Sequence, residues 1–319
     1  MHTVIGIEVS EAKKFLEQGN VIGIPTETVY GLAGNALNED AVLKIFKVKN
    51  RPYFDPLIVH THSVDELYKY VESIPHKAEK LLFKFAPGPL TVLLKRKLII
   101  PDLVTSGLET VAVRIPKHPL TLELLKQLSF PLAAPSANPF GYISPTTSYH
   151  VYDQLHGRIP YILDGGSTEI GVESTIVGFE EDEVVVYRLG GLAVEDIEKV
   201  VGKVKVNVVD SANPKTPGML KSHYAPKKKL VIFEDGAFDH SILKYHKPGI
   251  ISFSKAVEGV AAEQQIQLSA SGNLNEAAKN LFAAMRKLDA ADVDIIYAVK
   301  FPEEGLGRAI NDRLRRASA

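Results

Sequence analysis

Residues 21–32 read VIGIPTETVYGL, an apolar run that turns abruptly into a polar one. The run at 21–24 predicts a short buried strand, which Pro25 ends because proline has no amide hydrogen for a ladder bond. Thr26, Glu27 and Thr28 follow directly. Ligands of α/β proteins commonly bind beyond the carboxyl ends of strands, so we expect a binding site here. The alternative is a plain strand-to-helix turn.

Helical and strand patterns alternate along the chain and predict a mixed α/β protein. Strands are predicted at 57–59, 90–94, 111–115, 132–134, 161–163, 175–177, 184–187, 230–233, 250–253 and 295–299, and helices at 11–18, 40–48, from 63, at 194–201 and at 276–288. Turn formers without an apolar period at 210–218 indicate a linker. We therefore expect a first domain at 1–204, a linker at 205–228 and a smaller α/β domain at 229–319.

Composition narrows the protein class. The chain is 45% hydrophobic and 24% charged, as in folded proteins, and no stretch approaches the roughly 20 apolar residues of a membrane helix. It has no cysteine, which excludes disulfides and thiolate metal sites. The start has no secretory pattern, so a cytoplasmic location without membrane contact is expected. Because 37 basic residues face 38 acidic ones, any nucleic-acid contact must come from a local patch.

The common nucleotide and metal motifs are absent or weak. There is no P-loop sequence. Gly305-Leu306-Gly307 lacks the third glycine of a dinucleotide fingerprint and favours a helix-entry turn. His60 and His62 have no third ligand nearby, so ordinary polar histidines are favoured over a metal site.

Two polar loops could instead bind an anion. Lys49 and Arg51 end a predicted helix, where they either complement the helix dipole or form a clamp that Pro52 makes rigid. Ser136 and Asn138 follow another buried strand among small residues that let a ligand approach the backbone.

Several motifs together resemble the YrdC-type core of threonylcarbamoyl-AMP synthases. The order and spacing agree over the first two hundred residues, in the segments 25–34, 49–52, 56–60, 85–91, 112–116, 134–138 and 173–176. Segments 217–219 and 223–226 are similar to the linker of the long two-domain form, and 305–314 to the end of its C-terminal domain. The resemblance implies a twisted mixed sheet with flanking helices, followed by a smaller Rossmann-like domain.

The family resemblance also implies a reaction. Members are nucleotidyltransferases that condense L-threonine, bicarbonate and ATP into threonylcarbamoyl-AMP and pyrophosphate. The product goes to the tRNA threonylcarbamoyl-transferase machinery that makes t6A37, with at most a weak contact to tRNA. Mg²⁺ is expected with ATP, and no dedicated protein metal site. Such chemistry needs positioning and charge neutralisation more than acid–base groups.

Matching positions imply site residues. Threonine and its carbamate would contact Thr28, His60, Arg114, Ala134 and Ser174. ATP would contact Lys49, Arg51, Asp55, Thr110, Ser136, Asn138, Ser144, Arg188 and Tyr224. Lys49 and Arg51 would stabilise the transition state as the catalytic residues. Asp55 departs from the family pattern, which often has a neutral residue there, and Leu220-Lys221-Ser222 replaces a more basic stretch.

Two alternatives from other classes remain. A non-catalytic RNA-binding or ribosome-associated protein could use the same core, but the near-zero net charge and the retained linker disfavour it. A carbamoyl-transfer maturation module usually lies in a larger chain with zinc-finger parts, which a cysteine-free chain cannot form.

Overall fold

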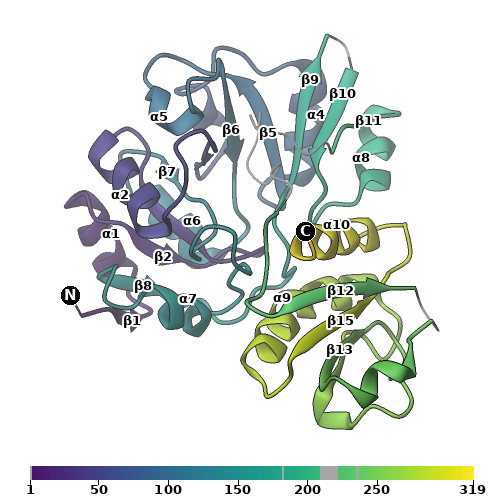
Figure 1. The fold of residues 1–319 in the computed structure, drawn as a ribbon. Coiled ribbons are helices and arrows are strands. Elements are labelled where there is room, and N and C mark those ends of the chain that lie inside the picture. The colour runs from purple at the N-terminus through teal and green to yellow at the C-terminus, as the bar shows by residue number, and fades with distance from the viewer. Residues whose placement is uncertain (1, 182, 209–221, 235–236) are drawn as a thin grey trace.

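A computed structural model describes residues 2–181, 183–208, 222–234 and 237–319, which form two α/β parts (Figure 1). The described strands of the first part make one mixed sheet in the order β1-β8-β2-β3-β7-β4-β6-β5-β9-β10-β11. These strands are β1 (Val4–Gly6), β2 (Ile22–Ile24), β3 (Gly31–Asn35), β4 (Ile58–His60), β5 (Leu90–Lys95), β6 (Thr110–Arg114), β7 (Leu132–Ala133), β8 (Tyr161–Leu163), β9 (Thr175–Glu180), β10 (Glu183–Arg188) and β11 (Lys205–Val206).

Helices flank this sheet, as expected. They are α1 (Val9–Glu17), α2 (Glu39–Lys49), α3 (Val64–Leu67), α4 (His76–Phe85), α5 (Asp102–Thr105), α6 (Pro119–Gln127), α7 (Ser148–Leu155) and α8 (Val194–Val201). The predicted cap at Ser63 is confirmed, because its side chain accepts a hydrogen bond from the amide of Glu66, but the helix α3 is a single turn. Helix α8 has the predicted bounds.

Strand β3 is not among the predicted strands. Its sequence, Gly-Leu-Ala-Gly-Asn, has little strand propensity. The segment is a strand because it pairs antiparallel with β2 on one side and with β7 on the other. Packing around Gly34 is close, because an added Cβ would lie 3.0 Å from Val21 Cγ1 and that side chain would have to shift slightly.

The second part is a parallel sheet in the order β12-β15-β13-β14, as a Rossmann-like domain would have. Its elements are β12 (Lys229–Phe233), β13 (Pro248–Ser252), β14 (Gln265–Gln267), α9 (Leu274–Ala290), β15 (Ile295–Val299), α10 (Gly307–Ala317) and short 3₁₀ turns at His240–Lys244 and Ala262–Gln264. Gly307 begins α10, so the helix-entry interpretation of Gly305-Leu306-Gly307 is confirmed.

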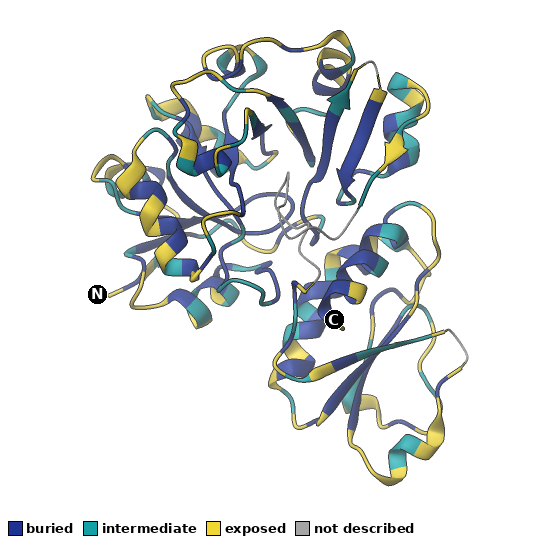
Figure 2. Cartoon of the chain, turned by 45° about the horizontal axis from the view of Figure 1, so that its top comes forward, coloured by how far each residue is buried: buried dark blue, intermediate teal, exposed yellow. Residues whose placement is uncertain are grey.

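The two parts share a hydrophobic core. Val29, Ile143 and Val172 of the first part pack in one cluster with the buried faces of α9 and α10. These two helices lie between the small sheet and the first part, and their buried faces are visible in Figure 2. Apolar contact across a boundary favours a fixed arrangement of the two parts.

The expected boundaries can be compared with the elements. Strand β11 pairs with β10 at residues 205–206, so the first sheet reaches slightly past 204, and β12 begins at Lys229. Most of the expected linker, including segment 217–219 and Leu220, lies outside the described residues. None of the helices in the described ranges is both long and apolar enough to cross a membrane.

Candidate active site

A small cavity of about 50 Å³ lies in the first part, and His223 and Tyr224 line it as well. Seven of the predicted site residues line it directly: Arg51, His60, Arg114, Ala134, Ser136, Arg188 and Tyr224. The structure therefore brings together residues that are up to 173 positions apart in sequence (224 minus 51).

The cavity floor is one face of the sheet. Ile58 and His60 both line the cavity and are two residues apart on β4, so their side chains share a face. His60 pairs with Arg114 on the neighbouring parallel strand β6. His60, Arg114 and Arg188 are the last residues of β4, β6 and β10, and Thr26 of the loop after β2 also lines the cavity. The expected position at the carboxyl ends of strands is therefore confirmed.

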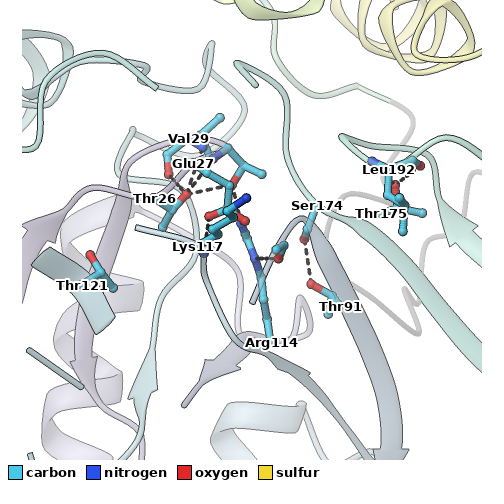
Figure 3. A network of polar contacts seen from close by, with 12 residues as sticks. Thr26, Glu27, Val29, Thr91, Arg114, Lys117, Thr121, Ser174, Thr175 and Leu192 are labelled. Atoms are coloured by element: carbon cyan, nitrogen blue, oxygen red, sulfur yellow. Dashed lines mark hydrogen bonds and ion pairs between the residues drawn. The ribbon is translucent and has the colours of Figure 1, made fainter. Parts of the chain in front are cut away.

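Arg114 connects the floor to the loop after β2 (Figure 3). Its Nη2 donates to Glu27 Oε1 at 2.8 Å and to Thr28 Oγ1 at 2.9 Å, and Nε donates to the carbonyl of Gly88 at 3.3 Å. Glu27 also accepts the amide hydrogen of Lys117 at 2.9 Å. Arg114 and Glu27 are both buried. The guanidinium is thus fixed in direction while it still borders the cavity.

Lys49 fixes the loop that follows β7. Its Nζ donates to the carbonyl oxygens of Ser136 and Asn138, and the amide of Phe140 donates to the carbonyl of Lys49 at 2.7 Å. Asn50, which caps α2 in the left-handed conformation, turns the chain from Lys49 to Arg51. Burial, and then Arg51, lower the pKa of Lys49 well below its usual value. An incoming anion would reverse that shift.

Arg51 lies in the cavity wall with Asp55 behind it. The arginine donates to the carbonyls of Asp55 at 3.1 Å and Pro56 at 2.8 Å. Its Nη2 lies 2.9 Å from Asp55 Oδ2, yet neither carboxylate oxygen makes a hydrogen bond to a described residue, so the contact is Coulombic. Burial raises the pKa of Asp55, and Arg51 opposes that rise. Asp55 is not among the residues that line the cavity.

Arg188, at the end of β10, holds the loop before β9. It donates to the carbonyl of Ser174 at 2.9 Å and to its hydroxyl at 3.0 Å. Ser174 Oγ is also 2.7 Å from Thr91 Oγ1 on β5. The predicted threonine-side serine and the predicted ATP-side arginine are therefore direct partners.

Sequence reasoning missed two charged residues of this site. Glu173 lines the cavity, accepts a hydrogen bond from Ser144 at 2.6 Å, and pairs with Arg313 of α10 at 2.8 Å. Burial raises the pKa of Glu173, but Arg313 and Arg188 outweigh it and bring the pKa to about 2. Both residues lie within motifs that carried the family resemblance, and that position was the available signal.

The two histidines of the site are neutral near pH 7. Burial, together with Arg114, lowers the pKa of His60 to about 3. Burial likewise lowers the pKa of His223 to about 3, against the pull of Glu173. Neither ring supplies a positive charge to an anion, so that task falls to the arginines and Lys49.

Three predicted residues differ in how they relate to the cavity. Thr28 and Ser144 reach it through Arg114 and Glu173. Thr110 lies at the opposite end of β6 from Arg114, about 13 Å away at roughly 3.4 Å per residue, and does not line the cavity. In the described part of the chain, no group of three or more histidine, aspartate or glutamate side chains could hold a metal ion.

Comparisons with known proteins cover both parts. Residues 14–190 match the Sua5/YciO/YrdC family model, described as "Telomere recombination", and residues 192–319 match the model described as "Threonylcarbamoyl-AMP synthase, C-terminal domain". Threonylcarbamoyl-AMP synthase of Pyrococcus abyssi is 41% identical, over 96% of this chain and 93% of the relative. That of Bacillus subtilis is 40% identical, over 98% and 93%. The crystal structure of P. abyssi Sua5 complexed with L-threonine is 39% identical and superposes with a TM-score of 0.91, covering 99% of this chain and 97% of the other.

Proposed function

Because this chain belongs to the threonylcarbamoyl-AMP synthase family, we propose that it condenses L-threonine, bicarbonate and ATP into threonylcarbamoyl-AMP and pyrophosphate. The product is an activated carbamoyl donor, which a tRNA threonylcarbamoyl-transferase machinery would use to make t6A37. The relatives that carry this name extend over nearly the whole chain.

The observation that carries the proposal is the charge of the cavity. Three arginines line it, at 51, 114 and 188, against one lining carboxylate, Glu173, which pairs with Arg313. The carboxylates that pair with Arg51 and Arg114, Asp55 and Glu27, do not line the cavity, so the charge that faces a ligand is positive. Guanidinium groups in a water-poor cavity bind phosphates and carboxylates strongly, because the low dielectric strengthens the attraction. ATP and threonine carbamate are both anions of this kind.

Arg114 would bind the carboxylate of threonine. Its Nε and Nη2 are held by Gly88, Glu27 and Thr28, and the side chain still borders the cavity. Because Nε and Nη2 are used in these contacts, Nη1 is the nitrogen that would donate to the carboxylate of threonine, and the charge assists that hydrogen bond. Neutral His60 lies beside it on β4 and adds shape and a polar ring atom, not charge.

Lys49 and Arg51 would face the phosphates. Bicarbonate gives carbon dioxide and hydroxide, and the amine of threonine adds to the carbon dioxide and loses a proton, so that a carbamate and one water are formed. A carbamate oxygen then attacks the α-phosphorus, the bond between the α-phosphorus and the bridging oxygen to the β-phosphorus breaks, and pyrophosphate leaves. Negative charge shifts onto the phosphate oxygens during this step, and fixed cations stabilise it without rearranging.

Mg²⁺ would arrive with ATP. Glu173 already contacts Arg313 and Ser144, and Asp55 lies behind Arg51, so neither carboxylate is placed to bind a metal ion. The ion would therefore be bound mainly by phosphate and water oxygens. Such an ion neutralises phosphate charge. Bicarbonate, ATP and any weak contact with tRNA belong to this proposal. A non-catalytic RNA-binding role is the less favoured alternative, because the formal charge is −1.

A direct assay tests the proposal. The purified protein is incubated with ATP, threonine and bicarbonate, pyrophosphate is measured, and the adenylate is identified by mass. Leaving out threonine is the matched control. Pyrophosphate release that does not depend on threonine, or none at all, would exclude the synthase function.

A further inference from the structure

Arg313, on α10 of the C-terminal domain, contacts the first part directly. Its side chain is fully buried. Nε donates to Glu173 Oε2 at 2.8 Å, and Nη2 donates to the carbonyl of Leu189 at 2.8 Å. The guanidinium carbon also lies 5.1 Å from the centre of the Tyr224 ring. One side chain of α10 thus contacts three separate segments around the cavity.

The contact between Arg313 and Glu173 changes the charge that faces the cavity. The Glu173 carboxylate lines a cavity that we assign to anionic substrates, where a bare negative charge would repel phosphate. Arg313 places a positive charge on one oxygen, and Ser144 donates its hydroxyl to the other at 2.6 Å. The carboxylate is therefore satisfied on both oxygens and its charge is balanced.

Tyr224 is held through the same helix. It has a positive φ of 65°, which is unfavourable for a residue with a side chain and persists only where surrounding contacts fix it. Its ring stacks on Phe282 of α9 at 5.4 Å, beneath the Arg313 guanidinium. The amide of His223 donates to the carbonyl of Arg316 at 3.1 Å. The cavity wall at 223–224 is therefore built on the C-terminal domain.

We infer that Arg313 is a positioning residue through which the C-terminal domain completes the ATP side of the active site: it balances the charge of Glu173 and supports Tyr224 in the cavity wall. This inference rests on the proposed function. It gives the C-terminal domain a task in the synthase reaction itself, in addition to any other role.

The charge-balancing part has a distinctive consequence. Replacing Arg313 by methionine removes the ion-pair partner of Glu173. The carboxylate beside the nucleotide is then less well balanced, although Arg188 still lowers its pKa. Arg313→Met should therefore raise the KM for ATP by about tenfold or more, while the KM for threonine changes by less than about threefold. Removing the carboxylate as well, in Arg313→Met with Glu173→Gln, should recover a large share of the ATP affinity, because residue 173 is then neutral. Asp312, which also pairs with Arg313 at 2.8 Å, keeps its contact with Arg316 at 3.0 Å.

The experiment measures ATP affinity by calorimetry and both KM values for wild type, Arg313→Met, Glu173→Gln and the double variant. Arg315→Met, which removes a half-exposed arginine of the same helix, is the matched control and should stay close to wild type. Arg313→Lys keeps the positive charge and should fall between wild type and Arg313→Met in ATP affinity. If Arg313→Met does not fold, the ATP affinity of Arg313→Lys is compared with that of Arg313→Lys with Glu173→Gln, and the double variant should again bind ATP more tightly than the single one.

Two results would overturn the inference. One is an Arg313→Met protein that folds and keeps its ATP affinity. The other is a double variant in which the two losses simply add, which would mean that Arg313 does not act through Glu173. Failure of the proposed function looks different, because the wild type would then make no threonylcarbamoyl-AMP.

Discussion

Arg114→Met tests the buried ion pair beneath the cavity. Arg114 and Glu27 are 4% and 1% exposed and lie 2.8 Å apart. Removing one partner of such a pair costs about 3–5 kcal/mol, because the other charge stays buried, and for a unit of about 200 residues this corresponds to a loss of roughly 6–20 °C in Tm. The hydrogen bonds to Thr28 and Gly88 are lost as well, which lowers the free energy of unfolding further.

Two measurements separate stability from binding. Thermal unfolding gives the stability loss, and the double variant Glu27→Gln with Arg114→Met should recover more than half of it, since the glutamine can still accept the amide hydrogen of Lys117. Threonine binding should not recover, because it needs the guanidinium. We expect the KM for threonine to rise about 10- to 150-fold in both variants, from the roughly 1.5–3 kcal/mol of charge-assisted hydrogen bonds.

The matched control is Lys95→Met, which breaks an exposed ion pair with Glu72 at 3.1 Å and should cost less than about 1 kcal/mol. If Arg114→Met is as stable as this control, the assumption that burial makes the Glu27 pair costly to break is wrong. If the double variant regains threonine affinity, Arg114 does not bind the substrate carboxylate.

Four further predictions concern charge, pH and the backbone. Lys49→Ala and Arg51→Ala should each lower kcat about 10²–10³-fold with little change in threonine affinity, which steady-state kinetics would show, and near-normal turnover would refute their role. Because the pKa of Lys49 is lowered in the free enzyme and phosphate would raise it, ATP binding should take up protons, seen in calorimetry as an enthalpy that varies with the ionisation heat of the buffer. The pKa of His60 is about 3 in the folded chain and near 6.5 in the unfolded chain, so the unfolded state binds more protons between these values and the free energy of unfolding should fall as pH drops from about 6.5 toward 3. In denaturant titrations at several pH values, His60→Gln should lose less stability over this range than the wild type. The same loss in both proteins would argue against a buried neutral ring. Gly190→Ala should disrupt the 173–175 loop and lower activity, since its Cβ would lie 2.3 Å from the carbonyl oxygen of Glu173, and a fully active variant would contradict the close packing.

Part of the fold could be predicted from the chain because it depends on local patterns. Helix α8, strand β15 and the centres of most predicted strands come from apolar periodicity and turn residues, which act over a few positions. Strands β1, β3, β11 and β14 were not predicted. The Gly-Leu-Ala-Gly sequence of β3 has no strand preference of its own, so its conformation depends on the neighbours that pair with it.

The candidate site divides in the same way. The residue types at Lys49, Arg51 and Ser136 left an anion site open among other interpretations, and the family resemblance, which rests on local motifs, then placed them with Arg114 and Arg188 in a substrate site. Only the tertiary structure decided how they are used: Asp55 lies behind Arg51, Thr110 lies at the far end of its strand, and Glu173 meets Arg313 across 140 positions. Pairing between distant residues is set by strand order and domain packing. The sequence therefore determined which chemistry the chain can carry out, and the tertiary contacts determined which charges face the substrate and which are balanced behind it.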